Sequence, residues 1–272
     1  GQEFSGYAAQ VREAIRRLDG VKDRLRFLAL GGTAVGTGNN AAPGFAEETV
    51  GLLAQETGLP LAEARNHFAA QGGCDTPVEA GGELKTTAAA LIKIADDIRW
   101  LASGPHCGLG EINLPKRQPG SSIMPGKVNP VIPEAVIQAG TQVMGYDAVL
   151  GQCGCRGNLE LSAMQPLVAH NLLQGLEILA NSADVFAWAC VGDISANRQR
   201  CRDNVSRSLA VASNLTPFTG YEIAESVASQ AHEQGRSVEE VALEREIMPP
   251  EQLRRVLYGG SGANPGEQGA EL

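Results

Sequence analysis

The stretch that decides the fold class is Leu84-Lys-Thr-Thr-Ala-Ala-Ala-Leu-Ile-Lys-Ile-Ala-Asp-Asp-Ile-Arg-Trp-Leu-Ala102. Its apolar residues recur at alternating intervals of four and three, which places one apolar stripe along a helix of about 25 residues. The members of this stripe are Leu84, Ala88, Leu91, Ala95, Ile98 and Ala102. A stripe of this kind is stable only when partner helices cover it, so the segment predicts a long helix inside a bundle.

The sequence on either side predicts further helices, separated by glycine-rich segments. Strictly alternating segments, which would predict strands, are almost absent. Two more long helices are expected from Pro133 to about Leu150 and from Pro166 to about Cys190, because proline is tolerated in a first turn. Shorter helices are expected at 5–19, 44–57, 60–71, 197–213 and 219–233, and from Ser237, which forms a capping box with Glu240. We therefore predict an all-α fold, an elongated bundle of long helices.

Three parts are expected along the chain. Residues 1–193 form the central helical bundle, with a loop at 120–130, and 194–258 form a small helical C-terminal domain. Residues 259–272 lack apolar side chains to bury and are predicted to be disordered. The chain opens on Gly1 with what already reads as the entry to a helix, so we expect that a segment upstream is missing.

Composition excludes several classes of protein. The formal net charge of -9 and a pI near 5.0 leave no basic stripe for nucleic acid. The longest apolar runs fall short of the roughly 18–20 residues that a membrane span needs. We therefore expect neither a nucleic-acid partner nor a membrane partner, and an anionic substrate must meet a local positive site.

Cysteine usage indicates the compartment. The six cysteines show no regular disulfide spacing, which favours reduced thiols in a cytoplasm-like compartment, while a eukaryotic source would also allow mitochondria. Cys153 and Cys155 form a C-x-C pair, but no Cys or His lies at metal-ligand spacing from them. We expect no metal site and no cofactor.

The loop Gly120-Ser-Ser-Ile-Met-Pro-Gly-Lys-Val-Asn-Pro130 carries the chemistry. Glycines allow close approach of backbone N–H groups, Lys127 offers a positive charge, and Asn129 offers both a donor and an acceptor. An anionic, oxygen-rich ligand suits this composition. On composition alone, an ordinary linker between helices explains the loop equally well.

This loop resembles the signature of the fumarase/aspartase superfamily, in the form found in its fumarase and aspartase branches. Three other segments resemble those of class II fumarases, in the same order: Leu30-Gly-Gly-Thr-Ala-Val-Gly-Thr-Gly38, Lys93-Ile-Ala-Asp-Asp-Ile-Arg-Trp-Leu-Ala-Ser-Gly-Pro105 and Gly157-Asn-Leu-Glu-Leu161. The resemblance covers residues 1 to about 257. It implies a lyase of the tricarboxylic acid cycle that hydrates fumarate to (S)-malate by anti addition, through an aci-carboxylate intermediate.

The resemblance also implies roles for individual residues. Ser121 matches the general base, which must be deprotonated to act. Lys127 and Asn129 match groups that bind the substrate carboxylate and hold the charge that develops on it. Lesser contacts are expected from Ser122 and from the backbone of Val128. Glu134 matches a glutamate that pairs with a family histidine, although an ordinary first-turn helical glutamate is the alternative.

That histidine has no match among His67, His106, His170 and His232, which we interpret as structural or surface residues. In the family it lies just upstream of the segment that matches Gly1. The resemblance further implies a homotetramer whose active sites are shared between subunits.

Two alternatives remain. An aspartate ammonia-lyase is one, since Met164-Gln-Pro166 is closer to the aspartase pattern than to that of many fumarases. An inactive scaffold or assembly module is the other, because the histidine is missing.

Overall fold

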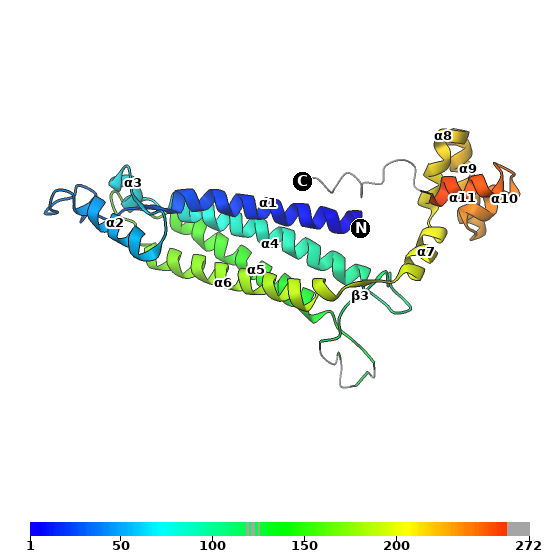
Figure 1. Cartoon of the computed structure of the whole chain (residues 1–272), viewed down its shortest axis with the longest axis horizontal. Helices are drawn as coiled ribbons and strands as arrows, with labels where there is room; N and C mark the ends of the chain where they lie inside the picture. The colour runs from blue at the N-terminus through cyan, green and yellow to red at the C-terminus, as the bar shows by residue number, and fades with distance from the viewer. Residues whose placement is uncertain (118–119, 121–122, 125, 260–272) are drawn as a thin grey trace. The chain divides into compact units, whose positions relative to one another are not determined.

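The structure, a computed structural model, describes residues 1–117, 120, 123–124 and 126–259 (Figure 1). This part of the chain is helical, with short two-residue strands, which confirms the predicted all-α class. The long helices are α1 (Gln2–Leu25), α4 (Asp75–Leu101), α5 (Val131–Gly154) and α6 (Gln165–Ala189). The shorter elements of the N-terminal half are β1 (Phe27–Leu28), α2 (Phe45–Thr57), β2 (Ala62–Glu63), α3 (His67–Gly72) and β3 (Ile112–Asn113).

The elements after α6 are short. They are η1 (Val191–Asp193), β4 (Ser195–Ala196), α7 (Arg198–Arg207), η2 (Leu209–Leu215), α8 (Thr216–Thr219), α9 (Tyr221–Gln234), α10 (Val238–Glu244) and α11 (Pro250–Tyr258). The chain divides into two compact units. The first consists mainly of Glu3–Arg99 and Leu114–Ile194, and the second of Trp100–Asn113 with the chain from Ser195 onward. The predicted boundary between domains at 193/194 and the predicted tail remain predictions, and residues 260–272 lie outside the described residues.

Helix α4 lies at the centre of the first unit, where α1, α4, α5 and α6 run side by side (Figure 1). Five members of its predicted stripe are buried: Leu84, Ala88, Leu91, Ala95 and Ile98. Ion pairs join Arg24 to Glu79 and Arg17 to Glu83, and the hydroxyl of Tyr7 donates to Asp97 over 2.8 Å. The start of α1 thus lies beside the end of α4, so these helices are antiparallel.

Small residues bring α4 and α5 close together. A Cβ added to Gly140 of α5 would lie 2.7 Å from Cγ1 of Ile92, and one added to Gly81 of α4 would lie 2.5 Å from Cδ1 of Leu150. Glycine therefore allows a helix separation that larger residues would prevent. The spacing of these contacts also makes α4 and α5 antiparallel.

Two predicted elements of the first unit were wrong in detail. Helix α1 continues through Gly20, where we expected it to end, because Val21 is buried and Arg24 pairs with α4. The predicted helix at 60–71 is instead β2 followed by α3. Residues Ala62 and Glu63 pair in parallel with Phe27 and Leu28, and the Asn66 side chain caps α3 by accepting from the N–H of Ala69.

The second unit has its own apolar core. Its buried residues come from η2 and from helices α9, α10 and α11: Val211, Ala212, Leu215, Ala224, Val227, Ala231, Val238, Val241, Ala242, Leu253 and Leu257. The predicted capping box at the start of α10 is confirmed, with Ser237 accepting from the N–H of Glu240 and the Glu240 carboxylate accepting from that of Ser237. The predicted helix at 197–213 is shorter than expected, because α7 stops at Arg207 and a 3-10 turn follows Ser208.

No helix in the described ranges combines the length and the apolar character that a membrane crossing would need.

Candidate active site

The described part of the signature loop closes on itself by hydrogen bonds. The N–H of Gly120 donates to the carbonyl of Lys127 over 2.9 Å, and Nδ2 of Asn129 donates to the carbonyl of Gly120 over 3.0 Å. Position 120 requires glycine, because a Cβ there would lie 2.4 Å from the oxygen of Lys127. These contacts fix where Lys127, Val128 and Asn129 leave the loop and enter α5.

The predicted site residues of this loop differ in what they can still bind. Lys127 is exposed, and its ammonium makes no ion pair with another described residue, so it is available to an anion. Val128 is 40% exposed. Asn129 uses one amide hydrogen on Gly120, and its carbonyl oxygen and second amide hydrogen have no partner in the described part of the chain. The predicted base Ser121 and its neighbour Ser122 lie outside the described residues.

Glu134 lies in the first turn of α5, where its backbone N–H donates to the carbonyl of Pro130 over 3.2 Å. Its carboxylate Oε1 lies 3.9 Å from Nη2 of Arg99 on α4. The same guanidinium donates from Nη1 to Asp96 over 2.8 Å. Arg99 is thus held between two carboxylates, and Glu134 has a cationic partner within this chain.

Sequence reasoning missed Arg99. The only local signal is the i, i+3 spacing from Asp96, which places both side chains on one face of α4. The contact with Glu134 depends on how α4 and α5 are aligned, and no sequence spacing encodes that alignment.

An anchor also holds the segment that leads into the loop. Nε of Arg117 donates to the carbonyl of Ala189 over 2.7 Å, and Nη2 pairs with Asp193 over 2.7 Å. Its guanidinium lies 5.7 Å from the centroid of the Trp188 ring. Arg117 therefore ties the start of the loop to the end of α6.

The four histidines belong to other segments of the chain than this loop. His67 is the best defined, since its Nε2 lies 3.2 Å from the carbonyl of Leu30 and 3.5 Å from Glu63. In the described part of the chain, no group of three or more His, Cys, Asp or Glu side chains is arranged to hold a metal ion.

A long-helix bundle with a cationic glycine-rich loop leading into one of its helices is the arrangement of a lyase in the fumarase/aspartase superfamily. Comparison with known families agrees. The family model described as "Lyase" matches residues 1–145, and the one described as "Fumarase C C-terminus" matches 212–258. The chain belongs to this lyase family.

Within that family the chain is similar to class II fumarate hydratases, so the predicted resemblance is confirmed. The enzyme of Thermosynechococcus vestitus is 47% identical over 255 residues, covering 94% of this chain and 55% of that one. The Mycobacterium tuberculosis enzyme is 45% identical over 249 residues, covering 91% and 52%. The chain spans about half the length of these curated relatives.

Solved structures show the same similarity. A class II fumarase from Schistosoma mansoni matches with a TM-score of 0.92 at 36% identity, covering 97% of this chain and 58% of that one. A fumarate lyase:delta crystallin from Brucella melitensis bound to cobalt matches with a TM-score of 0.89 at 42% identity, covering 94% and 56%.

Proposed function

We propose that the protein containing this chain is a fumarate hydratase, which interconverts fumarate and (S)-malate. The observation that carries the proposal is the exposed Lys127, which has no ion pair with a described residue, in a loop closed by Gly120 and Asn129, in a chain 44–48% identical to class II fumarate hydratases. A dicarboxylate needs a fixed cation of this kind, because the chain as a whole is acidic. No cofactor enters the proposal.

The chemistry follows from the residue types. In the dehydration direction, Ser121 removes a proton from the carbon next to one carboxylate, and that carboxylate becomes an aci-carboxylate with two negative charges. Lys127 and the second amide hydrogen of Asn129 stabilise this charge, with smaller contributions from Ser122 and the Val128 N–H. The hydroxyl group then leaves the neighbouring carbon, takes up a proton and departs as water. Hydration runs the same steps in reverse.

Glu134 acts beside the reacting groups in this proposal. Its carboxylate would orient a histidine supplied from outside these 272 residues, while Arg99 holds it from the α4 side. The alternative of a purely structural first-turn glutamate predicts little loss of activity on Glu134→Gln.

We also propose that active sites are completed by assembly into a homotetramer. Large apolar side chains stand exposed along α6: Leu167, Leu173, Leu176 and Trp188. An exposed apolar row on a long helix is typical of a subunit interface. Replacing Leu173 and Leu176 by Glu should lower the mass measured by light scattering. The control is Glu177→Lys, which reverses the charge of a neighbouring residue and should leave the mass unchanged.

A cytoplasmic location is part of the proposal as well. All six cysteines are described, and all are free thiols, as in a reducing compartment.

The test follows the ultraviolet absorbance of fumarate formed from malate, with aspartate as a parallel substrate. The expected result is malate turnover that Ser121→Ala abolishes and Lys127→Met lowers by about a hundredfold or more. Turnover of aspartate with release of ammonia, without malate turnover, would assign the aspartase branch, for which Met164-Gln-Pro166 provides the sequence argument. If the tetrameric protein turns over neither malate nor aspartate, the chain belongs to an inactive scaffold.

A further inference from the structure

The second unit contains a pocket of about 690 Å³ between the end of α7, the end of α9, α10 and α11. Pockets that bind small molecules fall at roughly 300–1,000 Å³. Charged side chains of both signs line it: Arg207, His232, Arg236, Glu239 and Glu240. None of its lining residues belongs to the candidate active site, so the pocket is a site distinct from it.

Both carboxylates of the pocket already accept hydrogen bonds from partners in the chain. The carboxylate of Glu240 accepts from the N–H of Ser237 over 2.8 Å and from its hydroxyl over 3.0 Å, and the backbone bond is the main reason that the pKa of Glu240 is lowered. The carboxylate of Glu239 accepts from Nε of Arg254 over 2.8 Å. Glu239 is thus paired with a cation, and Glu240 is held in place by the two donors of Ser237.

Tyr258 supplies Glu239 with a second donor. Burial, and then the hydrogen bond to Glu239, raise the pKa of Tyr258 to about 12. The phenol therefore stays protonated at neutral pH and donates to Glu239. Its ring remains on the wall of the pocket as an apolar surface.

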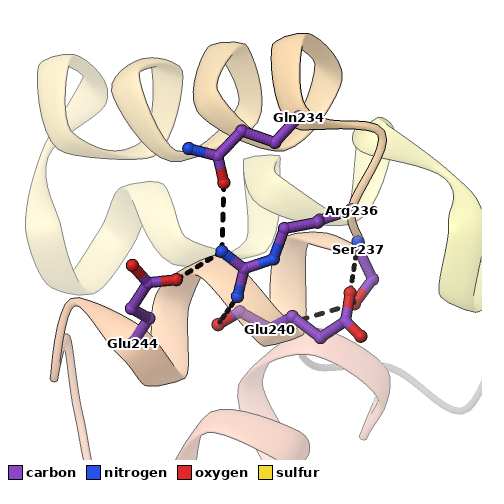
Figure 2. A network of polar contacts seen from close by, with 5 residues as sticks. All are labelled: Gln234, Arg236, Ser237, Glu240 and Glu244. Atoms are coloured by element: carbon purple, nitrogen blue, oxygen red, sulfur yellow. Dashed lines mark hydrogen bonds and ion pairs between the residues drawn. The ribbon is translucent and has the colours of Figure 1, made fainter.

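The guanidinium of Arg236 is also bonded to partners within the chain, as Figure 2 shows. Its Nη1 donates to Oε1 of Gln234 over 3.0 Å and pairs with Glu244, while Nη2 reaches the carbonyl of Glu240 over 3.4 Å. These bonds hold the guanidinium between α9 and α10. Arg236 shapes the wall of the pocket but has little capacity for a ligand.

Arg207 and His232 are the exceptions. In the described part of the chain neither side chain makes a hydrogen bond or an ion pair, and both line the pocket, from the last residue of α7 and the last turn of α9. A guanidinium has five donors and no acceptor, and its planar fork matches carboxylate and phosphate oxygens. Arg207 is therefore a cation of this pocket that has no partner among the described residues.

We propose that this pocket binds a small organic oxyanion, a polycarboxylate or a phosphate ester, with its charged group on Arg207 and His232. The volume leaves space for the organic part of the ligand, against Leu209 and the ring of Tyr258. This proposal does not depend on the lyase activity, because binding can be measured without turnover.

The test is isothermal titration calorimetry on the full chain with two probes, propane-1,2,3-tricarboxylate and glucose 6-phosphate. At least one probe should bind saturably, and which one binds distinguishes the carboxylate from the phosphate source. Arg207→Gln should weaken that binding about tenfold or more, since it removes charge-assisted hydrogen bonds. His232→Gln should weaken it by a smaller factor.

The matched control is Arg255→Gln, which removes an exposed arginine of the same unit that does not line the pocket. It should leave the affinity unchanged, and the unfolding midpoints of all three variants should match that of the parent chain. The proposal is overturned if neither probe saturates, or if Arg255→Gln weakens binding as much as Arg207→Gln does.

Discussion

Nη2 of Arg99, near the end of α4, lies 3.9 Å from the Oε1 atom of Glu134 in the first turn of α5. This contact joins the central helix of the bundle to the helix that begins directly after the signature loop. It also gives Glu134 a fixed neighbour of opposite charge, while Asp96 holds the other nitrogen of the same guanidinium.

If Glu134 acts in catalysis, loss of this contact should lower turnover. We expect Arg99→Gln to reduce kcat about tenfold with a smaller change in KM, because a misplaced Glu134 affects the chemical step more than the binding of the carboxylates. Arg99→Lys should restore part of the loss by keeping the charge. Stability should fall by only roughly 0.2–1 kcal/mol, as for exposed ion pairs.

The control for Arg99 is Arg245→Gln, which removes an exposed arginine that bonds to Ser226 in the second unit. Malate turnover and thermal unfolding of each variant provide the comparison. Equal kcat for Arg99→Gln and the parent protein would show that Glu134 needs no partner on α4.

Gly81 and Gly82 are adjacent glycines of α4 that differ in how closely the neighbouring helix approaches them. A Cβ on Gly81 would meet Leu150, which is buried, whereas one on Gly82 would meet no atom within 4 Å. We expect Gly81→Ala to destabilise the protein by about 1–3 kcal/mol through overpacking. Gly82→Ala should instead stabilise it by up to about 1 kcal/mol, because alanine favours the helix. Urea unfolding of both variants measures the difference, and equal effects would contradict the close α4–α5 contact.

The long helices were predictable because their signal is local. The stripe from Leu84 to Ile98 repeats every turn, and all of its members in that range are buried as expected. The positions where helices end were not predictable when they depend on contacts with distant parts of the chain. Gly20 was expected to end α1, but Arg24, which pairs with Glu79 of α4, lies beyond it, so the helix continues.

The same distinction holds for the candidate site. The composition of the loop predicted Lys127 and Asn129 as candidate anion-binding groups, because a cation and an amide between glycines are a local feature. The bond from Asn129 to Gly120 and the contact of Glu134 with Arg99 arise only when the chain folds back on itself. The β1–β2 pairing of Phe27 with Ala62 was missed for the same reason.

Thiol chemistry should separate the six cysteines by environment. Cys107 and Cys155 are exposed, whereas Cys190 is buried, and burial raises its pKa to about 11 although Arg117 opposes that shift. Since the thiolate is the reactive form, Cys190 should be protected both by burial and by protonation. With a disulfide reagent at mildly alkaline pH, we expect a fast phase from the two exposed thiols.

The variant Cys107→Ser/Cys155→Ser should remove this fast phase. Cys190 should react only as the protein unfolds, and in Arg117→Met its pKa should rise further because the favourable charge is gone. A fast phase that persists in the double variant would mean that one of the other four thiols is open to solvent.

Acid stability should depend on Asp97, which holds α1 against α4. A hydrogen bond from Lys93 is the main cause that lowers the pKa of Asp97, and a hydrogen bond from Tyr7 adds to it, while burial opposes both. The folded protein therefore binds a proton at Asp97 less readily than the unfolded chain does. The stabilisation is fully present above the usual aspartate pKa of 3.8 and is lost as the pH falls through the lower folded-state pKa.

Asp97→Asn should therefore be less stable than the parent chain at neutral pH, and the difference should shrink as the pH is lowered below about 4. Urea unfolding at a series of pH values measures both curves. Asp19→Asn, which removes an exposed i, i+3 pair with Lys22 on α1, is the control and should show a smaller difference at neutral pH. If the gap between Asp97→Asn and the parent stays constant down to strongly acidic pH, the contribution of Asp97 to stability does not come from its charge.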